Sequence, residues 1–414
     1  MSSSRRTAVP RPGRGVARSV TAPQKFRAAC FTVEGLNSFA VVIYFSYLYF
    51  FFRDTFGFDD RQNLALAALI GLTYAAFSLW AGRFAQRCGY FTALKIGFGI
   101  MVAGLLLGSQ LGSVAGQIVA ACIVNIGMCF TWPVLEALVS EGDTPADIPH
   151  VIGIYNITWA GTNTLAFCIG GMLIEKLGYR SMFYVPLAVM VVQFALVFWL
   201  EKIHPPGRAA DGGRPALTAG PDQPAPARAK LFQRLAWLAN PFAYIAINTL
   251  VAVLPGIARK FELSTMGAGF ACSLWSFARF FTFIALWQWT GWHYRFRWLV
   301  TAFALLVVSF AAILIVPQLA TVLVAQLFFG AAVGLIYYSS LYYAMNASDA
   351  KSEHGGIHEA AIGVGNCLGP AVGAAALWLA PQSASIGAWA VSGLLAVGLG
   401  GLVWLRLHPA KGQR

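Results

Sequence analysis

Two histidines and a glutamate in the stretch HGGIHEAAIGVGNCLGP are residue types that bind metals or transfer protons. His354 and His358 are four residues apart, and Glu359 follows directly. On a helix this spacing places both imidazoles on one face, one turn apart. In a zinc protease the general-base glutamate stands between the histidines, in the order HExxH, whereas the order here is HxxxHE. The pattern is therefore poor support for an enzyme, and we expect no metal and no cofactor.

An arginine stands near the middle of the apolar stretch FACSLWSFARFFTFIALWQW. Arg279 is too far from either end of this stretch for its guanidinium group to reach water easily. A buried charge needs a partner, and Glu359 is the expected counter-ion, with Glu34 or an anionic substrate as alternatives. Such a pair either holds the helices together or takes part in substrate binding and coupling.

Two further glutamates lie in apolar stretches. Glu34 begins a stripe of polar and aromatic residues at steps of three and four. Burial makes a carboxyl group easier to protonate, so Glu34 is a candidate for proton coupling, unless it only satisfies neighbouring polar groups. Glu136 lies close to the end of its stretch, where we expect it to pair with Arg83 or Arg87 in an inner gate or to face the headgroups.

The elements that must position these residues are long apolar segments. The chain of 414 residues is 58% hydrophobic and 11% charged, whereas a soluble domain has about 25% charged residues. Twelve apolar runs are each long enough to cross about 30 Å of hydrocarbon as a helix. They cover residues 28–52, 62–82, 92–112, 116–140, 150–174, 181–201, 238–258, 266–290, 298–316, 319–345, 355–379 and 385–407. Because the runs are continuous rather than alternating, we predict an all-α integral membrane protein with twelve transmembrane helices, not a β-barrel.

The basic residues behind the net charge of +13 lie mainly in the tails and loops. This placement does not indicate a surface that binds nucleic acid. With both termini inside, most of the 29 Lys and Arg residues fall on the inner tails and loops, as the positive-inside rule requires. We therefore predict a multi-pass protein of the plasma (inner) membrane with both termini cytoplasmic and no nucleic-acid partner. Residues 1–27 lack the apolar core of a signal peptide and are predicted to be a disordered basic cytoplasmic tail, and residues 408–414 a second cytoplasmic tail.

A segment rich in Pro, Gly and Ala, HPPGRAADGGRPALTAGPDQPAPARAK, divides the chain into two halves. Because this composition cannot build a core, we predict a cytoplasmic linker over residues 202–235, between six-helix bundles at 28–201 and 236–407. The halves share several residues in the same order: Gly153, Asn163 and Gly170 match Gly356, Asn366 and Gly373. Parallel repeats of this kind place a substrate site between two pseudo-symmetric bundles, near the midplane of the membrane.

Residues 26–407 resemble the major facilitator superfamily (MFS). The loop GRFAQRCGYFTAL is similar to that family's signature loop, and the passage from GMCFTWPVLEAL to GGMLIEKLGYRSMFY is similar to its fourth to sixth helices. The resemblance implies the MFS fold, in which the first, second, fourth and fifth helices of each half line a central cavity.

The signature loop and its surroundings supply the expected gate, which comprises Gly82, Arg83, Gln86, Arg87, Gly89 and Glu136. Gln86 replaces the acid that this loop usually has, so we do not expect its usual ion pair between the halves. The fourth helix also lacks the arginine associated with proton-coupled members, and the fifth lacks the Gly-Pro pair linked with drug antiporters. Gly369 and Pro370 instead form a predicted hinge in the eleventh helix.

Amides, hydroxyls and aromatic rings on these helices suit a neutral or weakly charged polar solute. Asn and Tyr side chains also hold helices together, which is the alternative role for each of them. The predicted substrate and coupling site comprises Glu34, Asn37, Trp132, Asn156, Trp159, Asn163, Asn248, Arg279, Tyr338, Tyr342, His358, Glu359 and Asn366.

These features predict a secondary active transporter that works by alternating access. Its expected substrate is a small polar organic solute such as a sugar or nucleoside, taken up together with protons. No GxxxxGK[ST] motif is present, so ATP is not the expected energy source. Efflux of an amphipathic compound and a non-transporting membrane sensor are the alternatives. We expect a monomer whose partners are a small molecule and membrane lipid.

Overall fold

The computed structural model describes residues 22–141, 147–205, 226–347 and 351–408. Within these ranges the chain forms twelve helices, each long and apolar enough to cross a membrane. They are α1 Ala22–Phe56, α2 Asp60–Cys88, α3 Tyr90–Gln110, α4 Val114–Val139, α5 Ile148–Leu177, α6 Ser181–Ile203, α7 Pro226–Lys260, α8 Thr265–Gln288, α9 Phe296–Ile315, α10 Leu319–Ala347, α11 Lys351–Leu379 and α12 Ile386–Leu407. The prediction of an all-α protein with twelve spans is confirmed. Most of the predicted N-terminal tail, residues 206–225 of the linker and residues 409–414 lie outside the described residues.

Several helices are longer than the apolar runs that predicted them. α7 begins at Pro226, inside the predicted linker, rather than at residue 238. Its first turns bury Leu231, Phe232 and Leu235, while the basic residues between them are exposed. Because this end of the helix is amphipathic, its average hydropathy is too low for a transmembrane run. Residues 226–235 are therefore helical rather than linker.

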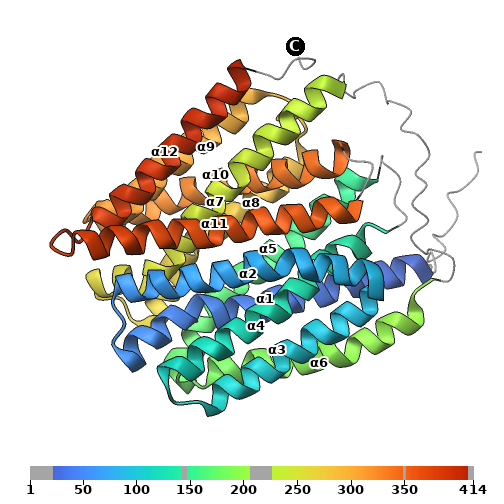
Figure 1. Ribbon diagram of the computed structural model, residues 1–414, viewed down its shortest axis with the longest axis horizontal. Coiled ribbons are helices and arrows are strands. Elements are labelled where there is room, and N and C mark those ends of the chain that lie inside the picture. Colours follow the sequence, from blue (N-terminus) through green and yellow to red (C-terminus); the bar gives the residue numbers. More distant parts are fainter. Residues whose placement is uncertain (1–21, 142–146, 206–225, 348–350, 409–414) are drawn as a thin grey trace, which may run out of the picture.

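The helices form two bundles that pack side by side (Figure 1): α1–α6 make the first and α7–α12 the second. The most extensive contacts between the bundles are those of α2 with α11 and of α5 with α8. These contacts are named here the α2–α11 seam and the α5–α8 seam. The side of the membrane on which α1 begins and α12 ends is named the terminus side, and the other is the opposite side.

Glycine permits the close approach of the two helices in the α2–α11 seam. Gly71 lies against the backbone of Asn366, so a Cβ atom at position 71 would overlap that backbone. A Cβ atom on Gly363 would lie 2.6 Å from the Cα atom of Ala75. Small residues at such crossings allow backbones to pack directly against each other. The seam therefore depends on the absence of side chains at these two positions.

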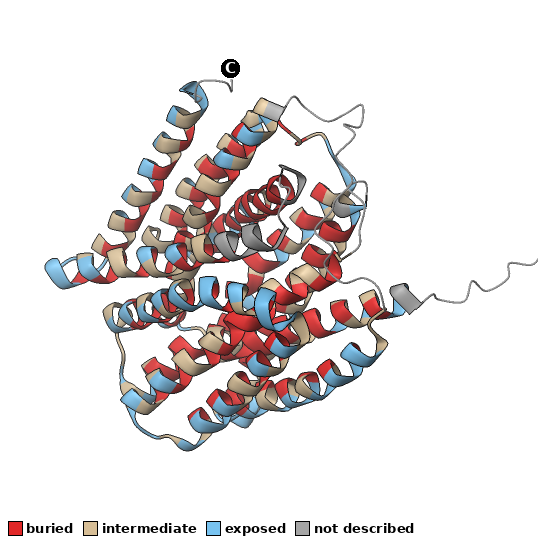
Figure 2. Ribbon diagram, turned by 45° about the vertical axis from the view of Figure 1, so that its right-hand side comes forward, coloured by how far each residue is buried: buried red, intermediate tan, exposed pale blue. Residues whose placement is uncertain are grey.

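Burial separates an apolar outer surface from a partly polar interior. Figure 2 shows the buried residues on the helix faces that turn toward one another and the exposed residues on the outer faces. Large apolar side chains such as Leu72, Val308 and Val397 are exposed, as expected of a surface that faces lipid. Charged groups such as Glu34 and Arg279 are buried inside. The interior thus holds the ionisable groups that the sequence singled out.

Candidate functional site

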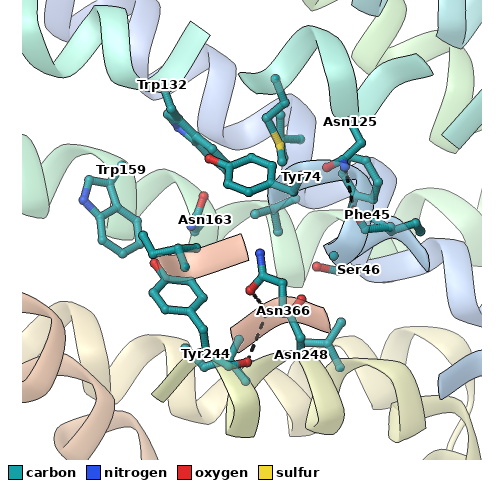
Figure 3. Close-up of a pocket in the computed structure, with 18 of the residues that line it drawn as sticks. Phe45, Ser46, Tyr74, Asn125, Trp132, Trp159, Asn163, Tyr244, Asn248 and Asn366 are labelled. Atoms are coloured by element: carbon teal, nitrogen blue, oxygen red, sulfur yellow. Dashed lines mark hydrogen bonds between the residues drawn. The ribbon is translucent and has the colours of Figure 1, made fainter. Parts of the chain in front are cut away.

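A cavity of about 190 Å³ lies between the two bundles. It is lined by side chains from α1, α2, α4 and α5 of the first bundle and from α7, α8, α10 and α11 of the second. These are the helices that the resemblance implied. The volume is enough for several water molecules or for a small organic molecule. Figure 3 shows asparagine, tyrosine and tryptophan side chains that converge on this space from both bundles.

The cavity brings together much of the predicted substrate and coupling site. The predicted residues that line it are Glu34, Trp132, Trp159, Asn163, Asn248, Arg279, Glu359 and Asn366. A pair of amide side chains joins α7 to α11 there. Asn248 Nδ2 donates a hydrogen bond to Asn366 Oδ1. The Asn163 amide, with its nitrogen turned toward the backbone, donates to the carbonyl oxygens of Trp159 and Ser38.

Glu34 is fully buried on α1. Its Oε1 accepts hydrogen bonds from Ser38 Oγ at 3.1 Å and from Trp132 Nε1 at 3.2 Å. Its Oε2 has no hydrogen-bond partner among the described residues, and no described cation lies within ion-pair distance. A carboxyl group in this setting is held in place by two neutral donors and keeps one oxygen available to a proton or a ligand.

Glu359 accepts a hydrogen bond from the hydroxyl group of Tyr74. This bond crosses from α2 to α11, so it joins the two bundles beside the cavity. The predicted ion pair between Glu359 and Arg279 is absent from the described ion pairs, and that prediction was wrong. The reason is that the hydroxyl group of Tyr74, whose role the sequence pattern did not reveal, binds the carboxylate of Glu359, while two indole rings lie against the guanidinium group of Arg279.

Arg279 is 5% exposed and lies between two indole rings. Its Cζ atom is 4.6 Å from the ring centroid of Trp159 and 4.7 Å from that of Trp275. Cation–π contacts of this kind stabilise a guanidinium group on its faces, but they leave its N–H groups without acceptors. Arg279 Nε is buried and has no hydrogen-bond partner. The edge of a buried guanidinium group therefore has no acceptor in the described part of the chain.

Trp159 is fixed by its neighbours rather than by Arg279 alone. Its Nε1 donates to Asn156 Oδ1 at 3.0 Å, and its ring packs against Phe283 and Tyr337 at centroid distances of 5.3 and 5.2 Å. Asn156, a predicted site residue, does not line the cavity but positions a residue that does. Asn37 is similar: it is fully buried and donates to Thr131 Oγ1 at 3.3 Å, which joins α1 to α4.

Tyr338 and Tyr342 are not brought to the cavity. They belong to an aromatic cluster between α10 and the loop after α8, in which both rings pack against Trp292. Tyr342 also stacks on His293 with centroids 4.2 Å apart. Burial lowers the pKa of His293 to about 4, so this imidazole is neutral at physiological pH. The cluster is therefore uncharged packing. The side chain of the remaining predicted residue, His358, lies outside the described part.

The predicted gate residues lie at or just after the terminus-side end of α2, except Glu136, which lies near the end of α4. Gly89 has a φ of 93°, a conformation that favours glycine, and it separates α2 from α3. Arg83, Gln86 and Arg87 are exposed. Glu136 makes no ion pair with either arginine, so that predicted contact was wrong. Glu136 is of intermediate exposure near the end of α4. Gly82, of intermediate exposure, lies within α2 itself.

On the opposite side a hydrogen bond joins the two bundles. Glu175, near the end of α5, accepts a hydrogen bond from the backbone N–H of Met266 at 2.8 Å, in the first turn of α8. A carboxylate at a helix N-terminus is favoured by the helix dipole. Two turns from it, Cys168 Sγ lies 3.4 Å from Ser273 Oγ across the same α5–α8 seam. The exposed contact between Glu175 and Met266 is named here the Glu175 clasp.

Replacing Glu175 by glutamine is expected to loosen the clasp, because the charge at the helix N-terminus is lost. We expect a membrane-impermeant maleimide to alkylate Cys168, left as the sole cysteine, roughly two- to fivefold faster, the range for one charge at a helix end. Glu262→Gln is the matched control, since Glu262 is exposed on the same side and its side chain makes no contact across the seam. Equal alkylation rates in both variants would show that Glu175 does not hold this side closed.

Three aromatic residues of the site could not be recognised from the sequence. Tyr74 binds Glu359, Trp275 covers Arg279, and Tyr337 packs on Trp159. Trp275 had a usable signal, since it stands four residues before the buried arginine and therefore on the same helix face. The described residues contain no group of three or more His, Cys, Asp or Glu side chains placed to hold a metal ion.

Comparisons with known proteins agree with this architecture. The protein-family model of the Major Facilitator Superfamily matches residues 28–370 of this chain. Among solved structures, the nucleoside transporter NupG is 13% identical with a TM-score of 0.68, and the match covers 92% of this chain and 99% of that one. The human organic anion transporter MFSD10 (TETRAN) is 16% identical with a TM-score of 0.65, over 92% and 99% of the chains.

A third structure belongs to a bacterial homolog of the human lysosomal transporter Spinster, in an inward-facing and unoccupied conformation. It is 14% identical with a TM-score of 0.64, and the match covers 94% of this chain and 96% of that one. These likenesses establish the fold, while the family model covers most of the chain. The superfamily consists of transporters rather than enzymes, which confirms the sequence prediction on this point. The chain therefore belongs to the Major Facilitator Superfamily.

Proposed function

We propose that this MFS secondary transporter takes up a small organic solute through the cavity between its bundles, in symport with protons. The observation that carries the proposal is the pair of buried carboxyl groups, Glu34 and Glu359, on opposite walls of one cavity and without a described cation as partner. A carboxylate that is buried without a cation has a desolvation cost that proton binding removes. The titratable groups that interact with the pair are Tyr74, Cys129, Glu136, Tyr155, Tyr244 and Tyr337.

The hydrogen bond from Tyr74 to Glu359 links proton binding to the movement of the bundles. Because the bond crosses the α2–α11 seam, a change in the charge of Glu359 changes the strength of a contact between the bundles. A ligand or proton shifts a conformational equilibrium only when it interacts differently with the two states. This contact provides such a difference, as alternating access requires.

We further propose that the terminus side is cytoplasmic and that the protein lies in the plasma (inner) membrane as a monomer. The support is the concentration of Lys and Arg in the loops and tails on that side. In this orientation the Glu175 clasp joins the bundles on the external side of the cavity.

Efflux of an amphipathic compound is the second candidate, favoured by the composition of the cavity wall. Phe45, Phe167, Trp159 and Trp275 give it a large apolar share beside its polar groups. Solved neighbours are named as transporters of nucleosides and of organic anions, which are both small organic solutes. These names support a small organic solute in general and leave the direction to experiment.

The function is tested by a ligand screen followed by transport. Sugars, nucleosides and organic acids are first screened for a rise in the melting temperature of the detergent-purified protein, because a ligand of the native state stabilises it. Stabilising solutes are then offered to proteoliposomes with an inward proton gradient. We expect accumulation that stops when the gradient is collapsed. Accumulation that persists without the gradient would contradict symport, and accumulation driven by an outward gradient would favour efflux.

A further inference from the structure

The strongest unexplained feature of the molecule is the buried cation without an anion. Arg279 is 5% exposed, lines the cavity and forms no ion pair or hydrogen bond with a described residue. Its Nε is buried without an acceptor, and so is Nε1 of Trp275, the indole that covers one face of the guanidinium group. Burying a charge without a partner is costly in a membrane protein. The site is therefore complete only when something supplies an acceptor.

We propose that the transported solute carries an oxyanion, a carboxylate in the first instance, that binds the free edge of Arg279. This assignment rests on the proposed function and narrows it from small organic solutes to organic anions. Two indole rings lie against the guanidinium group, with their centroids 4.6 and 4.7 Å from Cζ, and restrict its movement, while Nε remains without an acceptor. A planar carboxylate matches such an edge with two parallel hydrogen bonds.

The charges of the cavity fit an anion that enters together with a proton. When Glu34 and Glu359 each hold a proton, Arg279 is the one charged side chain among the described residues that line the cavity. A bound monoanion then cancels the charge of Arg279. This lowers the free-energy cost of the conformational change of the loaded protein, during which the site is enclosed by apolar helices. When one of these two protons is released together with the monoanion and the other stays bound, no net charge is transferred, so uptake is electroneutral.

The rest of the wall indicates the body of the solute. Tyr244 and Trp132 offer flat rings, and Asn248 and Asn366 offer amides near Tyr244. Such a surface binds an aromatic or short aliphatic body by ring contact and a few hydrogen bonds. A sugar has no anionic group for Arg279, so it leaves the guanidinium edge unsatisfied. The site therefore favours an organic acid over a neutral solute of equal size.

The test compares carboxylates with their neutral amides, which have nearly the same shape. Nicotinate with nicotinamide, benzoate with benzamide and indole-3-acetate with its amide are titrated into the wild-type protein, together with glucose and uridine as neutral solutes. The readouts are melting temperature and Kd. We expect stabilisation by at least one acid and not by its amide. Because this comparison uses the wild-type protein, it does not depend on whether a variant folds.

Two variants then locate the binding group. Arg279→Gln is expected to weaken binding of the selected acid about ten- to a hundredfold, the range for loss of a charge-assisted hydrogen-bonded pair. Arg279→Lys keeps the charge but not the two parallel bonds, and is expected to bind with intermediate affinity. An acid that binds Arg279→Gln as tightly as the wild type would overturn the proposal. Uptake of glucose or uridine by the Arg279→Gln variant would also overturn the proposal of an anionic substrate. The proposed transport function would stand in that case.

Discussion

Replacing Glu34 by glutamine is expected to abolish uphill accumulation of the substrate while leaving its exchange across the membrane intact. Glutamine keeps the acceptor oxygen for Ser38 and Trp132 but cannot bind and release a proton. One proton moved down a gradient of one pH unit supports about tenfold accumulation of a solute. The variant should therefore reach equal concentrations inside and outside, whereas the wild type should approach about tenfold.

The measurement is uptake of a stabilising solute into proteoliposomes with and without an inward pH gradient, followed by counterflow exchange. Glu201→Gln is the matched control, because Glu201 is an exposed glutamate that pairs with Lys95 far from the cavity. We expect this control to accumulate substrate like the wild type. Gradient-driven accumulation in Glu34→Gln would exclude Glu34 as the proton carrier and leave Glu359 to be tested in the same way.

Replacing Gly71 by alanine is expected to open the α2–α11 seam and slow transport about ten- to a hundredfold. The added Cβ atom would overlap the backbone of Asn366, which cannot move without shifting α11. Overpacking of this kind typically costs about 1–3 kcal/mol, and every 1.4 kcal/mol is a tenfold change in an equilibrium. Because alanine favours helix over glycine, loss of helicity in α2 cannot account for the effect.

The change is measured without a substrate by the distance between spin labels at Leu72 and Val364, which are exposed on α2 and α11. The labels are attached in a background that lacks the native cysteines. Gly71→Ala should shift the distances to larger values. Gly400→Ala is the control, since nothing lies within 4 Å of a Cβ atom there, and it should leave the distribution unchanged. Identical distributions for both variants would show that the seam tolerates a side chain.

The sequence predicted the twelve spans and their two-bundle arrangement because the cost of unsatisfied backbone in lipid leaves few alternatives. Helix ends were less predictable. The amphipathic start of α7 is buried against its own bundle, and an average over apolar residues does not detect that. The pattern of apolar residues thus locates the part of each helix that lipid surrounds. It does not show where the helix begins or ends outside the lipid.

The ionisable residues that line the cavity could be singled out from the sequence, but their contacts could not. Glu34, Arg279 and Glu359 were found because ionisable residues within apolar stretches are rare. Which of them contact each other depends on side-chain geometry across the seams, and Tyr74 and Trp275 proved decisive there. Tyr74 looks like an ordinary core aromatic in the sequence, whereas Trp275 could have been noticed from its place one turn before Arg279. The same limit explains Tyr342, whose place in the helical pattern gave no sign that it stacks on His293.

The central claim, proton-coupled transport of a small organic solute through the cavity, is tested most directly by the internal pH of proteoliposomes loaded with a pH-sensitive dye. A solute that stabilises the protein is added outside, and protein-free liposomes control for passive entry of weak acids. We predict internal acidification that requires the protein, keeps pace with solute uptake and is lost in Glu34→Gln. Solute uptake by the wild-type protein without any change in internal pH would contradict the claim.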